Sequence, residues 1–201
     1  MPDTESQVVE IVKACNARGV PLVTRGAGTG ISGGAIPLEN GVLVVLSRMK
    51  KILEVDPNSR TARLQPGVAN AAVTSASARD KLFYAPDPSS QIVCSIGGNV
   101  AENAGGPHCL ALGVTTNHVL GMEVVTAAGD VVWLGGRVAD GLGYDLRGAF
   151  IGSEGTLGIA TKILVKLTPV PQQIVTLLAI FDAVPEASHT VPGQGPIQVT
   201  A

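Results

Sequence analysis

The sequence is short of cysteine and of aromatic residues. Only 3 of its 201 residues are cysteines, and Phe, Trp and Tyr together make up 3%. Three cysteines without a CxxC pair do not form the disulfide framework of a small secreted protein, so we expect a reducing compartment. Few aromatic side chains also leave little material for stacking against nucleic-acid bases.

An excess of positive charge and long apolar runs are missing too. The 14 Lys and Arg residues face 16 Asp and Glu residues, and no basic run occurs, which excludes nucleic acid as a partner. The apolar runs at 41–46 and 174–180 are far shorter than the ~20 residues of a membrane span. The amino-terminal MPDTESQ is polar and acidic, unlike a signal peptide. We therefore expect a cytoplasmic protein without a transmembrane segment, associated with membranes only through partners.

Hydrophobic periodicity predicts a small amino-terminal lobe. With 45% hydrophobic and 15% charged residues, the chain has the composition of a folded globular domain. Thr4 and Gln7 have capping-box spacing, and the apolar residues after them follow a helical period up to Gly19. Short buried strands are then predicted at 22–24 and 41–46, on either side of a glycine-rich loop.

The pattern changes to hairpins near residue 55. ILEVD, a PNS turn and RTARLQ form the first hairpin, and an alanine-rich helix is expected over 68–81. A second hairpin is predicted around the AGD turn at 128–130, and a last strand over 159–167. The segment after Pro185 is rich in Pro and Gly and has no periodicity, so it is interpreted as tail or loop.

These elements predict an α+β fold with two lobes. The smaller lobe, about residues 1–55, combines parallel strands with helices, and the larger, about 56–168, combines an antiparallel sheet with helices. A domain of this size buries enough surface on folding to need no disulfide or metal.

Glycine is abundant and clustered. Many of its 25 residues lie in three patches, RGAGTGISGG at 25–34, IGGNVAENAGG at 96–106 and GSEGTLG at 152–158. Glycine lets a backbone approach a ligand closely, so the patches are candidates for a binding site.

The first patch contains GxGxxG, the fingerprint of a dinucleotide-binding Rossmann fold, but its context excludes that fold. A Rossmann fingerprint opens a helix, whereas Pro37 and the Asn40-Gly41 turn lead here directly into a strand. Successive backbone N–H groups in such a loop still form an anion-binding nest, and Arg25 adds charge-assisted donors. Taken alone, this patch is equally consistent with a tight surface loop that binds nothing.

Taken together, the patches resemble a known family. The chain is similar to the FAD-binding domain of the vanillyl-alcohol oxidase/p-cresol methylhydroxylase superfamily in the order and spacing of DPSS, SIGGNVA, NAGG and GSEGTLGI. It resembles the 2-hydroxyacid branch, which includes the GlcD-like flavoproteins of glycolate oxidase and FAD-linked D-lactate dehydrogenases, in PHCLALG, HVLGMEVV and GYDLRGAFIGSEGTLGI. The resemblance runs from about residue 4 to residue 182.

This resemblance implies a noncovalent FAD site. It places 25–34 around the pyrophosphate, 88–105 along the ribityl chain and isoalloxazine ring, and 154–159 at the ribose and adenine. Thr29 stands where relatives with covalently attached flavin carry a histidine, so covalent attachment is not expected. The implied FAD-binding residues are Arg25, Gly26, Ala27, Gly28, Thr29, Gly30, Ser32, Gly33, Pro88, Ser89, Ser90, Ser95, Gly97, Gly98, Asn99, Asn103, Gly105, Glu154, Gly158 and Ile159.

The resemblance also implies an oxidoreductase. Its members oxidise a small 2-hydroxy acid, such as glycolate or D-lactate, to the 2-oxo acid by hydride transfer to flavin N5, and the expected partners are a second flavin subunit and an iron-sulfur electron-transfer subunit. Such proteins continue into a cap domain, and we expect the chain to end near its start, with 169–201 as that start and a tail. The alternative is a non-catalytic flavin-binding or assembly subunit of such a complex.

No catalytic residue is assigned from the sequence. His108 follows the second glycine patch and is the one candidate for a residue facing the active site, whereas His118 precedes an apolar strand and is expected at the edge of the core. The histidines are too far apart in sequence to predict a metal site. Glu102 and Glu123 are interpreted as helix and strand residues rather than general bases.

Overall fold

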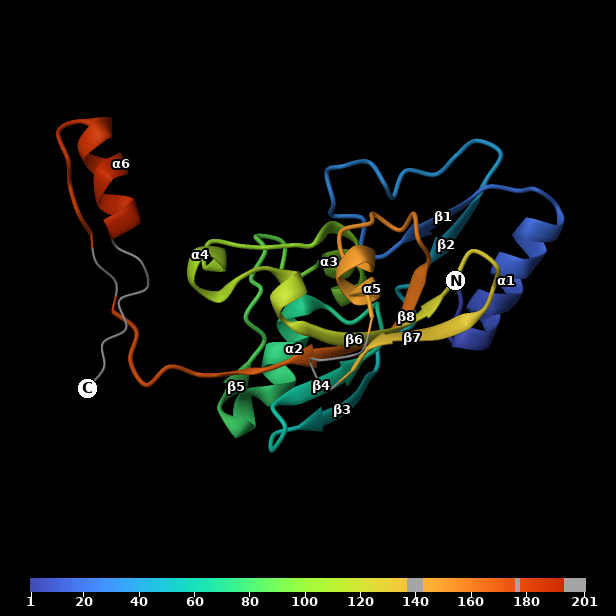
Figure 1. Ribbon diagram of the computed structural model, residues 1–201, viewed down its shortest axis with the longest axis horizontal. Coiled ribbons are helices and arrows are strands. Elements are labelled where there is room, and N and C mark those ends of the chain that lie inside the picture. Colours follow the sequence, from blue (N-terminus) through green and yellow to red (C-terminus); the bar gives the residue numbers. More distant parts are fainter. Residues whose placement is uncertain (137–142, 176–177, 194–201) are drawn as a thin grey trace.

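A computed structural model describes residues 1–136, 143–175 and 178–193 (Figure 1). The helices are α1 (Glu5–Ala17), α2 (Asn70–Ser77), α3 (Ile96–Glu102), α4 (Cys109–Leu112), α5 (Leu146–Phe150) and α6 (Val184–Gly193), with 3₁₀ turns η1 (Ala78–Asp80) and η2 (Thr115–Asn117). The strands are β1 (Leu22–Arg25), β2 (Val42–Val45), β3 (Ile52–Asp56), β4 (Thr61–Leu64), β5 (Leu82–Phe83), β6 (Val119–Val125), β7 (Val131–Gly135), β8 (Ile159–Lys166) and β9 (Thr168–Pro169). This mixture confirms the α+β prediction.

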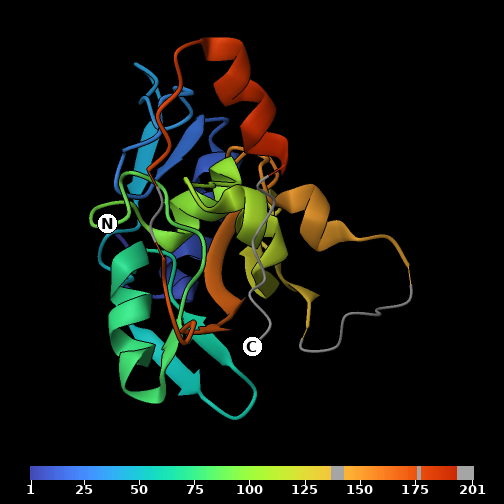
Figure 2. The ribbon, with the colours of Figure 1, turned by 90° about the vertical axis from the view of Figure 1, so that its left-hand side faces the viewer.

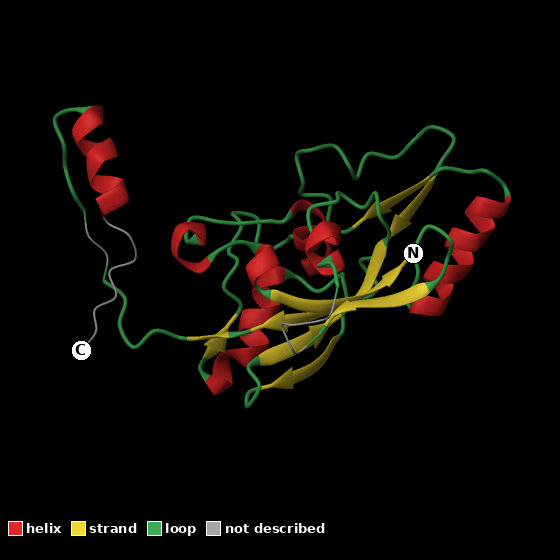
Figure 3. Ribbon diagram, viewed as in Figure 1, coloured by secondary structure: helices red, strands yellow, loops and turns green. Residues whose placement is uncertain are grey.

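A five-stranded antiparallel sheet, in the order β3-β4-β8-β6-β7, carries the larger part of the fold (Figure 3). Both predicted hairpins, β3–β4 and β6–β7, are confirmed, and β8 lies between them. Ala62 of β4 pairs with Val165 of β8, and Met122 of β6 pairs with Ile163. The predicted last strand is therefore the one that joins the two hairpins into a single sheet.

The amino-terminal part contains α1 and the parallel pair β1–β2, as expected. The Thr4 hydroxyl accepts a hydrogen bond from the Gln7 N–H at 3.3 Å, and the Gln7 side chain accepts one from the Asp3 N–H at 2.7 Å. The predicted helix start is confirmed, because the Thr4 hydroxyl satisfies an N–H group that the first helical turn leaves free, and the Gln7 side chain binds back to the residue before the cap. The loop between β1 and β2, residues 26–41, lies at the opposite end of the body from the β3–β4 hairpin (Figures 1 and 2).

Two apolar cores hold these parts together. The larger core packs α2, α3 and α5 against one face of the five-stranded sheet, with Ile96, Val100 and Phe150 facing Met122 and other strand residues. The smaller core joins α1 and β2 to the ends of β6 and β8, with the buried side chains Val8, Val12, Val44, Leu46, Met49, Val125 and Ile159. Strands β6 and β8 therefore contribute residues to both cores. The exact limits of the two lobes stay predictions.

One expectation about the carboxyl-terminal segment is wrong. Residues 184–193 form α6, where the sequence indicated tail or loop. The helix begins with Pro185 in its first turn, a position at which proline costs no hydrogen bond, and Glu186 favours the same turn. Figure 1 shows α6 apart from the sheets, and residues 194–201 lie outside the described residues. Among the described residues, none of the helices has the length and apolar character required to cross a bilayer.

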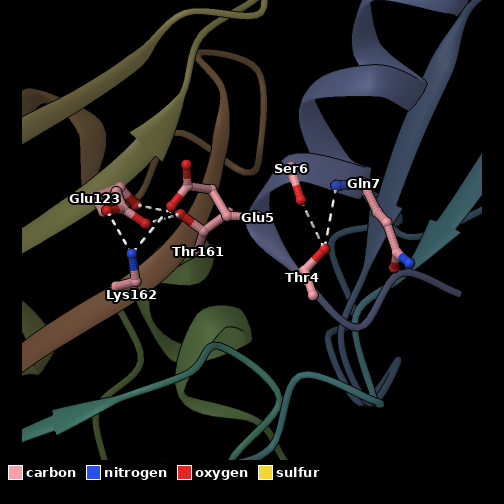
Figure 4. A network of polar contacts seen from close by, with 7 residues as sticks. All are labelled: Thr4, Glu5, Ser6, Gln7, Glu123, Thr161 and Lys162. Carbon is pink, nitrogen blue, oxygen red and sulfur yellow. Dashed lines mark hydrogen bonds and ion pairs between the residues drawn. The ribbon is translucent and has the colours of Figure 1, made fainter.

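A charged network fixes α1 to the sheet (Figure 4). Lys162 of β8 donates from Nζ to Glu5 of α1 at 3.0 Å and to Glu123 of β6 at 2.8 Å, and the Thr161 hydroxyl donates to Glu123 at 2.9 Å. The hydrogen bond with Glu123 and the contact with Lys162 lower the pKa of Glu5. Partial burial opposes ionisation of Lys162, but the two carboxylates raise its pKa overall.

We expect Lys162→Met to lower the free energy of unfolding by about 1–2 kcal/mol at neutral pH, because it leaves two partly buried carboxylates without their cation. Since the pKa of Glu5 is below its ordinary 4.5 in the folded state, its contribution is complete above that pH and is lost as the pH falls further. The difference between variant and parent should therefore shrink in acid. Urea unfolding at several pH values measures this, with Lys166→Met, an exposed lysine of the same strand, as the control. An equal loss for both variants would contradict a specific network.

Candidate cofactor site

The three glycine patches meet at one cleft between the β1–β2 loop, α3 and the start of β8. Its empty volume is about 1090 Å³, open solvent at the mouth included. The lining consists mainly of glycine, alanine, serine and backbone, with Leu46, Val100, Phe150 and Ile159 as larger apolar side chains. Such walls bring backbone groups close to a ligand and leave room for a large one.

On the side of the β1–β2 loop, Arg25 stands over a tight turn. Gly28 has φ +74°, and a Cβ added there would lie 2.5 Å from Nε of Arg25, so the guanidinium packs directly against the turn. Among the described residues, the Arg25 side chain has no ion-pair or hydrogen-bond partner. A partly buried cation without a partner beside a glycine turn is suited to an anionic ligand.

On the opposite side, the chain around α3 is packed closely. Ser95 caps the helix by accepting a hydrogen bond from the Gly98 N–H at 3.3 Å. A Cβ at Gly26 would lie 2.2 Å from the Ser95 hydroxyl, and a Cβ at Gly97 would lie 2.7 Å from Cβ of Pro66. These glycines are therefore required for the β1–β2 loop, α3 and the Pro66 segment to approach one another.

A buried amide faces the same cleft. Asn99 is 2% exposed, lines the cleft, and has no hydrogen-bond partner for Nδ2 among the described residues, apart from a weak interaction with the Cys94 thiol. Burial raises the pKa of Cys94, so this thiol is neutral at pH 7. A buried donor without a partner is costly, and a polar ligand in the cleft would satisfy it.

Two carboxylates complete the lining. Glu102 is the last residue of α3, and Glu154 adopts a left-handed conformation with φ +53° in the third patch. The Glu154 N–H donates to the Ala101 carbonyl at 2.9 Å, which ties the third patch to α3. No Lys, Arg or His lines the cleft within the described part of the chain.

Most of the expected site residues are brought together here. Those in the lining are Gly26, Ala27, Gly28, Thr29, Gly30, Pro88, Ser90, Ser95, Gly97, Gly98, Asn99, Glu154, Gly158 and Ile159. Those outside it are Arg25, Ser32, Gly33, Ser89, Asn103 and Gly105. Arg25 packs against the lining residue Gly28, and Ser32 donates a hydrogen bond to the lining residue Glu102. Asn103 follows α3 in a left-handed conformation and accepts hydrogen bonds from Thr116 at 3.0 Å.

Sequence reasoning missed several lining residues, among them Cys94, Glu102 and Phe150. Gly34 and Gly155 were visible as members of the glycine patches. The others carry no local signal, because a residue of a helix or strand reaches the cleft only through the packing of that element.

Neither candidate histidine lines the cleft. His108 is exposed and its Nδ1 lies 2.5 Å from Asp87. His118 is buried, donates from Nε2 to the Leu112 carbonyl at 2.7 Å, and has its pKa lowered by burial, as expected for the edge of a core. No group of three His, Cys, Asp or Glu residues suited to a metal ion occurs among the described residues.

The cleft and the Arg25 side chain beside it fit FAD. The unpaired guanidinium of Arg25 and the glycine turn suit a pyrophosphate, the unsatisfied amide of Asn99 suits a polar ring edge, and apolar side chains suit an aromatic ring. Together these groups have the chemistry that binding and orienting a flavin requires.

Curated relatives are similar over nearly the whole chain. Glycolate oxidase subunit GlcD of Escherichia coli (strain K12) is 53% identical over 191 residues, which are 95% of this chain and 38% of that protein. The protein of the same name from Bacillus subtilis (strain 168) is 44% identical, over 94% of this chain and 41% of its own length. D-lactate dehydrogenase of Anaerostipes hadrus is 37% identical, over 92% and 39%. The chain thus spans well under half the length of these relatives.

Solved structures and a domain family agree with the fold. Alkyldihydroxyacetonephosphate synthase superposes with a TM-score of 0.73 at 28% identity, over 86% of this chain and 32% of that one. The family described as "FAD binding domain" matches residues 1–135, which is more than half of the chain. From this match and the shared fold we conclude that the chain belongs to the FAD binding domain family.

Proposed function

We propose that the chain is the FAD-binding part of an enzyme that oxidises a small 2-hydroxy acid of the glycolate or D-lactate type. The observation that carries the proposal is the single cleft formed by all three glycine patches, with an unpaired cation and an unsatisfied amide beside it. The similarity to glycolate oxidase subunits and a D-lactate dehydrogenase supports the substrate class.

In this proposal the chain's own residues bind and orient the cofactor. Arg25 and the Gly28 turn would hold the pyrophosphate, Asn99 would donate from Nδ2 to a ring oxygen, and Phe150 and Ile159 would exclude water from the ring. FAD, when bound, supplies the acceptor for the hydride that leaves the substrate's α-carbon. The relative from E. coli is named as a subunit of glycolate oxidase, which supports further subunits as partners of this chain. We propose that these partners are a second flavin subunit and an iron-sulfur subunit, and that the complex lies in the cytoplasm.

One observation favours a second function, a non-catalytic flavin-binding subunit. In the part of the chain that the structure describes, the charged side chains that line the cleft are Glu102 and Glu154, and both repel the carboxylate of a 2-hydroxy acid. Within the described residues, the lining therefore provides a place for the flavin but no cation for this substrate, because Arg25 beside it is assigned to the pyrophosphate. In an enzyme, basic groups from outside the described residues would have to supply that contact.

A chimera distinguishes the two functions. This chain replaces the matching 191 residues of the E. coli glycolate oxidase subunit, and dye-linked oxidation of glycolate is measured. We expect a rate within about tenfold of the parent, a barrier difference of about 1.4 kcal/mol, and a rate at least tenfold lower for the FAD-loaded chain alone. A chimera that binds FAD but is inactive would favour the non-catalytic subunit.

Acid precipitation of the FAD-loaded chain should release the flavin into the supernatant, since Thr29 offers no imidazole for covalent attachment. Flavin in the pellet would contradict noncovalent binding.

A further inference from the structure

The loop between β1 and β2 packs closely against α3 at Gly26 but has few hydrogen bonds to hold the rest of it in place. Residues 26–41 contain no helix or strand, and most of their side chains are exposed, including Ile31 and Ile36. Two local turns, Ile36 N–H to Gly33 O and Gly41 N–H to Leu38 O, are its internal backbone hydrogen bonds among the described residues. Neither bond connects the loop to another element.

One side-chain hydrogen bond makes that connection. The Ser32 hydroxyl donates to Oε2 of Glu102 at 2.8 Å, across 70 positions of the sequence. The same carboxylate also lies against Gly30, where an added Cβ would be 3.1 Å from Oε1. Within the described residues, this is the side-chain hydrogen bond that joins the loop to the rest of the molecule.

The acceptor stands on a firm support. Glu102 ends α3, whose start is capped by Ser95 and whose Ala101 carbonyl accepts a hydrogen bond from Glu154. Val100 of the same helix is buried in the larger core. Glu102 is therefore held by the body of the fold, and Ser32 is held by Glu102.

The charge of Glu102 and its hydrogen bond to Ser32 have opposite effects on the binding of FAD. A carboxylate that lines a cleft for a pyrophosphate opposes the binding of that dianion, so Glu102 as a mere charge would weaken binding. Its hydrogen bond has the opposite effect, because it fixes the loop that carries the glycine turn.

We propose that Ser32 and Glu102 form a latch that holds the 26–41 loop against bound FAD and sets the rate of FAD release. The two are positioning residues, and the proposal rests on the proposed FAD site. They act on the cofactor through Gly28, Thr29 and Gly30, which line the cleft between the latch and β1.

The test follows FAD release by flavin fluorescence after dilution of the FAD-loaded chain. Ser32→Ala and Glu102→Ala should each release FAD about three- to tenfold faster, the range for one lost hydrogen bond, and the double variant should be no faster than either. Glu102→Gln keeps an oxygen acceptor without the charge and should release FAD no faster than the parent. Glu39→Ala removes an exposed carboxylate from the same loop and should change nothing.

A second readout does not need FAD. Thermolysin should cut the apo chain near Ile31 and Ile36 faster in Glu102→Ala than in the parent or in Glu102→Gln. Slower release in both Glu102 variants would show that the residue acts by charge alone and would overturn the latch, as would unchanged release and cleavage in Ser32→Ala and Glu102→Ala. Failure of the parent to bind FAD would instead refute the proposed function.

Discussion

Gly98→Leu is expected to weaken FAD binding strongly while leaving the chain folded. Gly98 lies in α3 and lines the cleft, and a Cβ added there would contact only the Ser95 hydroxyl, at 3.3 Å. The rest of the leucine side chain therefore enters the space proposed for the flavin. We expect the dissociation constant for FAD to rise by roughly 100-fold, about 3 kcal/mol, at the upper end of the cost of overfilling a packed site.

The neighbouring glycine is the matched contrast. A Cβ at Gly97 would lie 2.7 Å from Cβ and 3.0 Å from the carbonyl oxygen of Pro66, so Gly97→Leu should unfold the chain at lower urea concentration. Gly98→Leu should not, because leucine in a helix is favoured over glycine by roughly 1 kcal/mol. Fluorescence titration with FAD and urea unfolding measure the two effects. Unchanged FAD affinity in a folded Gly98→Leu variant would refute this cleft as the flavin site.

Replacing Arg25 by glutamine should weaken FAD binding by about 10- to 100-fold, the range for one hydrogen bond to a charged group. The side chain packs against the Gly28 turn but has no ion-pair or hydrogen-bond partner among the described residues, so its replacement by glutamine breaks no internal polar contact. The loss should therefore appear in the FAD dissociation constant and not in the free energy of unfolding.

Two controls show whether Arg25 acts through a local contact with FAD or only through the net charge of the chain: the Arg48→Gln variant, and the dependence of FAD affinity on salt concentration. Arg48 is exposed and pairs with Asp3 at 2.7 Å, and it does not line the cleft, so Arg48→Gln should leave FAD affinity within about twofold of the parent. The affinity of Arg25→Gln should also depend less on salt than that of the parent. Equal losses in the two variants would mean that Arg25 acts only through net charge.

The sequence predicted the elements well where the signal was local. The Thr4 cap, the two hairpins and the glycine-rich loop each depend on residues a few positions apart, and each is confirmed. The helix α6 was missed because its start signals, Pro185 and Glu186, stand in a segment whose composition indicates a loop.

The candidate site was predicted less completely, for a physical reason. Glycine patches are visible in a sequence because backbone approach needs glycine itself, so most of the lining was anticipated. Glu102 reaches the cleft because of where α3 ends, and its partner Ser32 lies 70 positions away. Such contacts depend on packing between distant segments, which no local pattern records.

The central place of β8 in the sheet determines when the cofactor can be captured during synthesis. β8 is made after the other four strands of its sheet, yet it pairs with β4, made about a hundred residues earlier, and it supplies Ile159 and Ala160 to the cleft. Until it emerges, β4 and β6 each present an unpaired edge, which is a template for aggregation. The cleft is therefore complete only once β8 has paired with β4 and β6, so we expect a nascent chain to capture FAD after that pairing and not in stages.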